Sequence, residues 1–182
     1  MRKENFDQME MFRIYNDIAL KGEIVIYGTT YMAEFPFYEL SQKYLLKNAI
    51  YNRSMKGLTL EEAEEGLCDC VLELKPEKLF LSLGEHDTEN PLAVSIYRRI
   101  LQKIKDKLPL TAIYVMPVFG DSPDCARLNS ALQCLCKEQS VTFFPVSCKT
   151  MNGMLSYSQI FKQMTCAFRK GPITFSEAFS YS

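Results

Sequence analysis

Two short loops carry the side chains of this chain that are best suited to acyl-transfer chemistry. Gly28-Thr29-Thr30 follows the apolar stretch 24–27, and Gly84-Glu85-His86-Asp87 follows the apolar stretch 79–83. Thr30 offers a hydroxyl nucleophile, and His86, the one histidine among the 182 residues, offers an imidazole that can accept its proton. If the fold brings these loops together, they form a candidate site.

Short apolar segments alternate with amphipathic ones along the chain. Strands are expected at about 24–27, 48–51, 79–83, 111–116 and 141–146. Helices are expected at about 6–20, 33–47, 59–75, 90–108, 122–139 and 156–169. Because buried parallel strands read as continuous apolar runs, we predict a three-layer α/β/α sandwich with a five-stranded parallel, flavodoxin-like sheet and an extra N-terminal helix. In that order the first and third strands are neighbours, which places residues 28–30 beside 84–87.

Local signals refine two of these helices. Thr59 and Glu62 have the spacing of a capping box at a helix start. The acidic residues that follow are interpreted as a solvated face, which consists of Glu61, Glu62, Glu64 and Glu65. In the N-terminal helix, helical spacing predicts an inward stripe of Phe6, Met9, Phe12, Tyr15 and Ile18.

Composition and charge exclude several classes of function. The formal net charge of −1 leaves no broad basic face for nucleic acid and no polybasic membrane anchor. The charged N-terminus lacks the apolar stretch of a signal peptide, so we expect a cytoplasmic protein. The whole chain, 1–182, is expected to be one domain, with an N-terminal helix in 1–21, an α/β core in 22–169 and an unassigned tail in 170–182.

The seven cysteines are interpreted as free thiols. Cys68 and Cys70, like Cys134 and Cys136, lie two residues apart in helical segments and therefore face different ways. With one histidine in the chain, a zinc site would need thiolates from distant elements. We expect neither a metal nor a cofactor, and no glycine-rich phosphate-binding motif is present.

The order of these loops resembles the plan of the SGNH (GDSL-type) hydrolases. That family has its nucleophilic serine in Gly-Asp-Ser after the first strand. A glycine after the second strand and an asparagine in Gly-x-Asn-Asp after the third bind the oxyanion, and an Asp-x-x-His near the C-terminus supplies the base. Here Thr30 stands at the serine, Gly57 at the oxyanion glycine and His86 at the asparagine, and Asp87 is retained.

The departures from that plan imply a degenerate active site. The methyl group of Thr30 stiffens its rotamer, and a threonine hydroxyl without a base is a poor nucleophile. No Asp-x-x-His follows the fifth expected strand, where residues 148–153 stand instead. Cys148, in that region, is a weaker candidate nucleophile because nothing near it in sequence lowers its pKa.

Two functions stay open at this point. The first is non-catalytic binding of a small-molecule ligand or protein partner at the old cleft, with Thr30 capping a helix or turn and Gly28, Gly57, Glu85 and Asp87 at the oxyanion or ligand site. The second is an acyl- or acetyl-ester hydrolase that uses Thr30 with His86 as base, oriented by Glu85, Glu34 or Asp87. A Thr30 hydroxyl within about 3 Å of a His86 ring nitrogen favours the enzyme, and a hydroxyl turned into the backbone favours the binder.

Two further interpretations carry less weight in the sequence. If the resemblance to the SGNH hydrolases is wrong, the chain is another flavodoxin-like protein. A receiver-type protein should have a cluster of acidic residues at its strand ends, and here only Glu85 and Asp87 stand there. Four aromatic residues near the expected cleft either line an apolar pocket or belong to the core; they are Tyr31, Phe35, Phe37 and Phe119.

Overall fold

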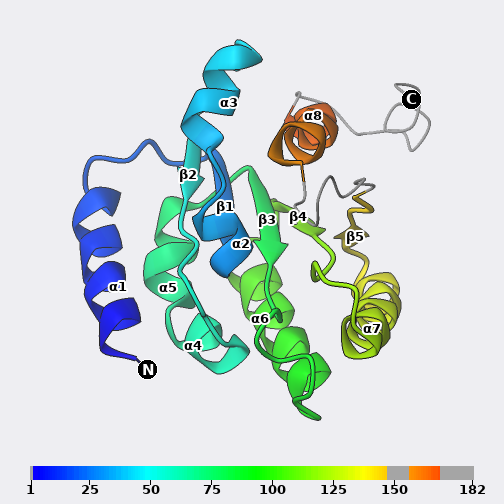
Figure 1. The fold of residues 1–182 in the computed structure, drawn as a ribbon. Coiled ribbons are helices and arrows are strands. Elements are labelled where there is room, and N and C mark those ends of the chain that lie inside the picture. Colours follow the sequence, from blue (N-terminus) through cyan, green and yellow to red (C-terminus); the bar gives the residue numbers. More distant parts are fainter. Residues whose placement is uncertain (1, 147–155, 169–182) are drawn as a thin grey trace.

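The sheet has the predicted topology. The computed structural model describes residues 2–146 and 156–168 (Figure 1). In this part of the chain, five parallel strands pair in the order β2-β1-β3-β4-β5. Their bounds are β1 (Ile24–Gly28), β2 (Ile50–Asn52), β3 (Lys78–Ser82), β4 (Ala112–Val115) and β5 (Thr142–Phe143). The predicted flavodoxin-like order is therefore confirmed.

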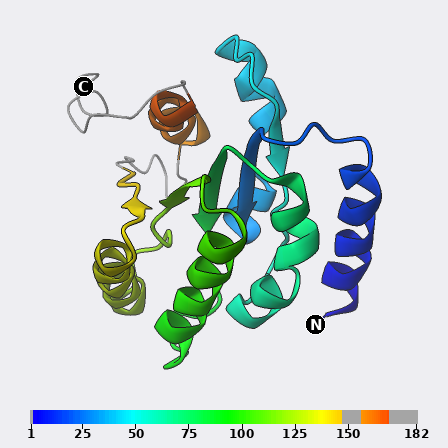
Figure 2. The same ribbon diagram turned by 180° about the vertical axis from the view of Figure 1, so that it is seen from behind.

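Helices cover both faces of the sheet, which gives the three predicted layers (Figures 1 and 2). The layer on one face contains α4 (Leu60–Glu65), α5 (Leu67–Cys70), α6 (Ala93–Lys107) and α7 (Pro123–Gln139), with α1 (Lys3–Asn16) packed on α5. The other layer contains α2 (Thr30–Ala33), α3 (Phe37–Lys43) and α8 (Tyr157–Phe168). A short 3₁₀ turn, η1 (Leu72–Leu74), follows α5.

The strands feed these two layers by simple alternation. In β1, Val25 and Tyr27 pack into the first layer, whereas Ile24 and Ile26 pack into the second. Every residue of β1 and β3 is buried, because both strands are interior and both faces are covered. Gly28 pairs with Ser82 at the carboxyl ends of these two strands, so the loops after them start side by side.

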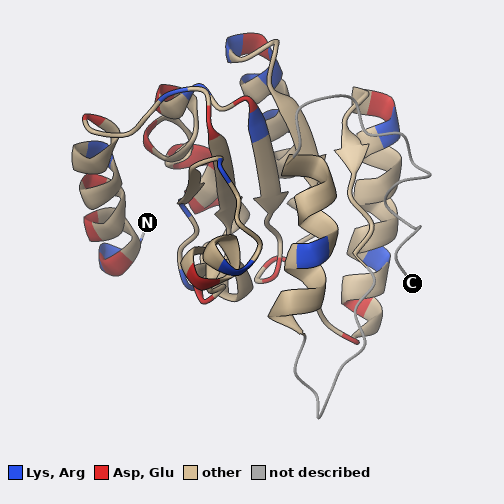
Figure 3. Ribbon diagram, turned by 90° about the horizontal axis from the view of Figure 1, so that it is seen from above, with Lys and Arg blue, Asp and Glu red and all other residues tan. Residues whose placement is uncertain are grey.

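The inward face of α1 differs from the predicted stripe. Asn5, Met9, Phe12 and Asn16 are buried, whereas Phe6, Tyr15 and Ile18 of the predicted stripe are exposed. The reason is that α1 packs on α5 and the loops beside it, where polar groups need partners. Asn5 donates to Glu62, and Asn16 donates to the carbonyl of Asp69. Basic and acidic residues also share the surface of α1 (Figure 3).

Two helices that the sequence predicts as continuous are divided. The segment 33–47 yields α2 and α3, separated at Pro36, because a proline disfavours helical geometry in the residue before it. The segment 59–75 is divided at Gly66 into α4 and α5. Its capping box is confirmed, but the acidic run is not a uniform solvated face: Glu62 is buried and Glu64 forms ion pairs with Arg99 and Lys103. Cys148 and the expected tail lie outside the described residues.

Candidate functional site

Gly28 ends β1 at a point of close approach between backbone and helix. A Cβ at this position would lie 2.9 Å from Cβ of Met32 and 3.0 Å from the carbonyl oxygen of Ser82, so only glycine fits without a shift. The carbonyl of Gly28 accepts a hydrogen bond from the N–H of Met55. Gly28 is buried and holds three chain segments together at the base of the site.

The hydroxyl of Thr30 is the point at which three loops meet. Its Oγ1 lies 3.0 Å from Nε2 of His86, and the backbone N–H of Gly57 donates to the same oxygen at 2.9 Å. Capping of α2 is done by the side chain of Thr29, which accepts from the N–H of Thr30. The structure thus joins Thr30, His86 and Gly57, and the Thr30 hydroxyl does not serve as a helix cap.

Glu85 ties the loop after β3 to the loop after β1. Its Oε2 accepts from the hydroxyl of Thr29 at 3.0 Å and from the N–H of Tyr31 at 3.3 Å. The carboxylate therefore satisfies polar groups at the start of α2 and holds that turn against the neighbouring strand end. Thr29 was not singled out from the sequence. The signal that was available is that threonine is a preferred residue at the start of a helix.

Asp87 ties the same loop to the start of α4. It is buried, and its Oδ2 accepts from the N–H of Leu60 at 3.1 Å. Burial raises the pKa of Asp87, while the hydrogen bonds from Leu60 and Asn90 and the nearby His86 act in the opposite direction. Its carboxylate thus faces inward, into the helix start.

None of the three predicted carboxylates orients the imidazole in the described part of the chain. Glu85 and Asp87 accept hydrogen bonds from the turns that they hold, and Glu34 forms an ion pair with Lys56 at 2.7 Å. His86 itself is exposed. Among the described residues the ring has one hydrogen-bond contact, with the Thr30 hydroxyl, and no hydrogen bond or ion pair joins it to a carboxylate.

The tautomer of His86 decides what this arrangement can do. With its proton on Nδ1, the ring accepts a hydrogen bond from Thr30 at Nε2 and is placed as a general base. With its proton on Nε2, His86 and the N–H of Gly57 both donate toward one oxygen, as in an oxyanion-binding site. The same atoms thus support either proton transfer or the binding of an anionic or carbonyl oxygen.

Aromatic rings pack beside the site. The ring of Tyr31 lies 4.6 Å from that of Phe119 and 5.3 Å from that of Tyr157, and all three residues are partly buried. Phe35 and Phe37 stack on each other and are buried in the core of the second layer. Of the four predicted aromatic residues, Phe35 and Phe37 are therefore core, whereas Tyr31, which follows Thr30, and its neighbour Phe119 pack on the outer edge of that core.

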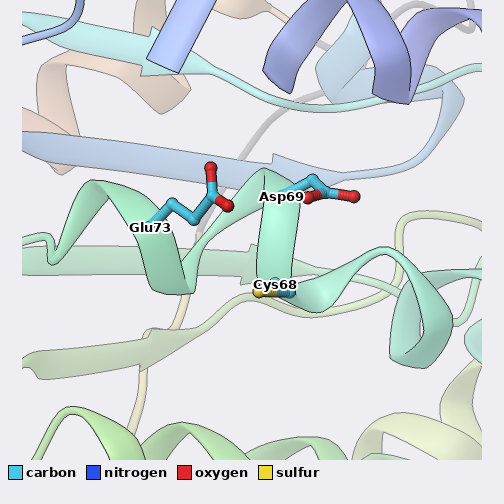
Figure 4. Close-up of side chains that lie close together, drawn as sticks. All are labelled: Cys68, Asp69 and Glu73. Atoms are coloured by element: carbon cyan, nitrogen blue, oxygen red, sulfur yellow. The ribbon is translucent and has the colours of Figure 1, made fainter. Parts of the chain in front are cut away.

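A second cluster, on α5 and η1, has side chains of metal-ligand type. Figure 4 shows Cys68, Asp69 and Glu73, whose ligand atoms lie within 4.8 Å of one another. Asp69 faces Arg13 at 3.6 Å, and Glu73 accepts from Asn16 at 3.0 Å. Burial and the two carboxylates raise the pKa of the Cys68 thiol, which disfavours the thiolate that a metal requires. Asp69 and Glu73 instead bind side chains of α1 and help to dock that helix.

Comparison with known proteins gives a result for the fold. No family model matches the sequence, and no curated protein matches it significantly. A structure from Streptococcus pneumonia, provisionally described as a platelet activating factor, has a TM-score of 0.80 at 20% identity and covers 92% of this chain and 94% of its own. The chain has the SGNH (GDSL-type) hydrolase fold.

Two further solved structures are a GDSL-like lipase and a lipase/acylhydrolase. A GDSL-like lipase from Bacteroides thetaiotaomicron has a TM-score of 0.63 at 13% identity and covers 81% of this chain and 83% of its own. A lipase/acylhydrolase from Enterococcus faecalis has a TM-score of 0.58 at 18% identity, with coverage of 68% and 75%. None of the described helices of this chain combines the length and apolar character needed to cross a membrane.

Proposed function

We propose that this chain is a slow acyl- or acetyl-ester hydrolase in which Thr30 is the nucleophile and His86 the general base. The observation that carries the proposal is the 3.0 Å contact between Thr30 Oγ1 and His86 Nε2. Nucleophile and base must lie within hydrogen-bond reach of each other, and this pair does so on the fold of GDSL-type hydrolases.

The reaction follows from these contacts. Thr30 Oγ1 attacks the ester carbonyl carbon while its proton passes to Nε2 of His86. In the resting protein the N–H of Gly57 donates to Thr30 Oγ1. The movement of this oxygen toward the ester frees that N–H, which then donates to the developing oxyanion. The intermediate expels the alkoxide, which takes the proton from His86 and leaves as an alcohol. Water, deprotonated by His86, then attacks the acyl-threonine ester; Thr30 Oγ1 leaves and takes the proton back from His86, and the acid is released.

The expected rate is low for two physical reasons. The threonine methyl group restricts the rotation that attack requires. No described carboxylate holds the second nitrogen of His86, and loss of such a carboxylate function lowers kcat by about 10,000-fold in a serine protease triad. We therefore expect slow turnover of activated short-chain esters.

The second candidate is non-catalytic binding of an acyl or carboxylate ligand at the same atoms. It is favoured by the exposed imidazole without a described carboxylate partner, because that ring is free to carry its proton on Nε2 and donate. The donors of Gly57 and His86 then bind an oxygen without turnover.

The cytoplasm remains our proposed compartment, in keeping with the free surface thiols of Cys68 and Cys134.

Hydrolysis of p-nitrophenyl acetate by the purified protein, beside Thr30→Ala and His86→Ala, tests the proposal. We expect a burst or steady release of nitrophenolate that falls at least about 100-fold in both variants, and an acyl adduct on Thr30 detectable by mass spectrometry. Equal background rates in all three folded proteins would reject the enzyme. In that case, acetate binding that shifts the NMR signals of Gly57 and His86 would support the second candidate.

A further inference from the structure

The N-terminal helix reaches the candidate site through its first residues. Asn5 and the adjoining Arg2 contact Glu62 of α4, which lies close in sequence to Gly57. The backbone N–H of Arg2 donates to Glu62 Oε1 at 2.7 Å, and its guanidinium donates to Glu62 Oε2 at 3.2 Å. Asn5 donates to the same oxygen at 2.9 Å. Glu62 is therefore the anchor of this end of α1.

Glu62 is suited to that task by its surroundings. It is buried, and it also accepts from the N–H of Thr59 in the capping box. Burial acts to raise the pKa of Glu62, but the hydrogen bonds from Arg2, Thr59 and Asn5 outweigh it and lower the pKa. The carboxylate is thus a stable acceptor for both the backbone N–H and the guanidinium of Arg2.

From this anchor, the guanidinium of Arg2 extends to the loop that carries Gly57. Its Nη2 donates to the carbonyl of Gly57 and lies 3.4 Å from the carbonyl of Lys56. The carbonyl of Lys56 and the N–H of Gly57 belong to one planar peptide unit and point in opposite directions. Fixing that carbonyl on the Arg2 side therefore directs the N–H toward Thr30, where it donates at 2.9 Å.

Gly57 is also shaped for this contact. Its φ of +63° is in the left-handed region, which glycine adopts without strain. A Cβ at this position would collide with the guanidinium of Arg2. The positive φ is therefore the main reason for glycine at position 57, and a side chain there would in addition displace the guanidinium of Arg2 from its contact with the loop.

We propose that Arg2, anchored by Glu62, is a positioning residue that sets the direction of the Gly57 N–H at the Thr30 hydroxyl. The extra helix is in this sense part of the site, although none of its side chains touches Thr30 or His86 in the described part of the chain. The proposal rests on the proposed function only where it concerns turnover; the position of the N–H is a property of the resting protein.

Arg13→Ala is a matched control for Arg2→Ala. Arg13 lies on α1, which begins directly after Arg2. It is exposed to a similar degree (58% against 54% for Arg2) and faces Asp69 of α5 much as Arg2 faces Glu62 of α4. Its hydrogen bond and ion pairs go to Glu10 and Asp69, away from the loop of Gly57. A general loss of α1 docking therefore affects both variants, whereas loss of positioning affects only Arg2→Ala.

Amide hydrogen exchange of Gly57, followed by NMR on the full chain, is the decisive measurement. We expect exchange at Gly57 to become about tenfold faster in Arg2→Ala and to stay unchanged in Arg13→Ala, with sheet amides such as Leu81 unchanged in both. Arg2→Lys, which keeps one charged donor, should restore part of the protection. Equal Gly57 exchange in wild type and Arg2→Ala, or equal acceleration in both alanine variants, would overturn the inference.

A kinetic measurement separates this inference from the proposed function. If the protein hydrolyses esters, Arg2→Ala should lower kcat about tenfold with KM unchanged, because the oxyanion is stabilised in the transition state rather than in the bound substrate. If wild type has no activity, the proposed function fails, and the exchange result still decides the role of Arg2.

Discussion

The carboxylate of Asp87 accepts a hydrogen bond from the backbone N–H of Leu60 at 3.1 Å, and this bond connects the two loops that meet at Thr30. Asp87 directly follows His86, and Leu60 comes three residues after Gly57. The distance between the imidazole and the oxyanion-type N–H is therefore set partly by a buried carboxylate that touches neither the hydroxyl nor a substrate.

Replacement of Asp87 tests this connection. Asp87→Ala leaves the N–H of Leu60 without an acceptor at a buried helix start and should lower the free energy of unfolding by about 1–3 kcal/mol. Asp87→Asn keeps an acceptor oxygen and should lose less. Urea unfolding of both variants and wild type measures the free energies of unfolding. An alanine variant as stable as wild type would show that the hydrogen bond does not stabilise the fold.

The raised pKa of Asp87 has a definite sign in the pH dependence. Its folded pKa lies above the unfolded value, so the folded state binds this proton more readily. The associated stability is present below the unfolded pKa, near 3.9, and is lost as pH rises through the folded pKa. Relative to Asp87→Asn, wild type should therefore lose stability as pH rises from about 3 upward. Parallel stability curves for the two proteins would show that burial does not raise the pKa of this carboxyl.

Thr30→Ser removes the methyl group and keeps the hydroxyl. We expect kcat on an activated ester to rise on the order of tenfold, because the serine side chain rotates more freely toward the carbonyl carbon. Thr29→Ser is the matched control, since it keeps the hydroxyl that Glu85 holds and should leave the rate unchanged. A slower Thr30→Ser enzyme would mean that the threonine methyl is part of a fitted pocket.

His86→Asn distinguishes a base from a donor at this position. Asparagine supplies an N–H near Thr30 but cannot accept a proton at neutral pH, so loss of general base catalysis should lower kcat by about 100-fold or more. The measurement is the same ester assay, with circular dichroism to verify the fold. Retained activity in His86→Asn would instead identify His86 as an oxyanion donor, the role that the resemblance to the SGNH hydrolases implies for an asparagine at this position.

Glu64 gives a pH prediction away from the site. The hydrogen bond from Arg99, joined by Lys103 and opposed by burial, lowers the pKa of Glu64 to about 2. Its stabilising contribution is present above the unfolded pKa, near 4.3, and is lost as pH falls toward 2. Because both partners are about half exposed (53% each), that contribution should be on the order of 1 kcal/mol at low salt.

Glu64→Gln is the variant that measures this contribution. It should unfold more easily than wild type at pH 7, and the difference should shrink between pH 5 and pH 2. Glu65→Gln, at an exposed neighbouring position, is the control. A difference that stays constant down to the lowest pH would show that the ion pairs with Arg99 and Lys103 do not carry it.

The sequence predicts the sheet well because its short, continuous apolar runs are typical of buried parallel strands. The order of β1 and β3 then follows from general rules of parallel sheets, and it brings Thr30 and His86 together. The sequence does not predict the partners of Glu62, because a capping box accounts for that residue locally without reference to α1. Nor does it predict that Asn5 is buried and Phe6 exposed, since periodicity counts apolar residues and the surface that receives α1 is polar.

Orientation of the imidazole is a further point that the sequence does not settle. Three carboxylates near His86 in sequence or space were equivalent candidates, namely Glu34, Glu85 and Asp87. Their partners depend on which donors lie nearest in the folded chain: the ammonium of Lys56 for Glu34, the hydroxyl of Thr29 for Glu85 and the backbone N–H of Leu60 for Asp87.

The groups that contact the Thr30 hydroxyl, and the residues Arg2 and Asp87 that hold their loops, come from the first half of the chain, whereas the rings that pack on Tyr31 include Phe119 and Tyr157 from the second half. Recombination between homologous genes at a crossover near residue 90 would therefore exchange the aromatic surroundings of the site while preserving its hydrogen-bonding groups. Ligand preference and chemistry could then diversify separately, with β3 and β4 as the junction that any such chimera must keep in register.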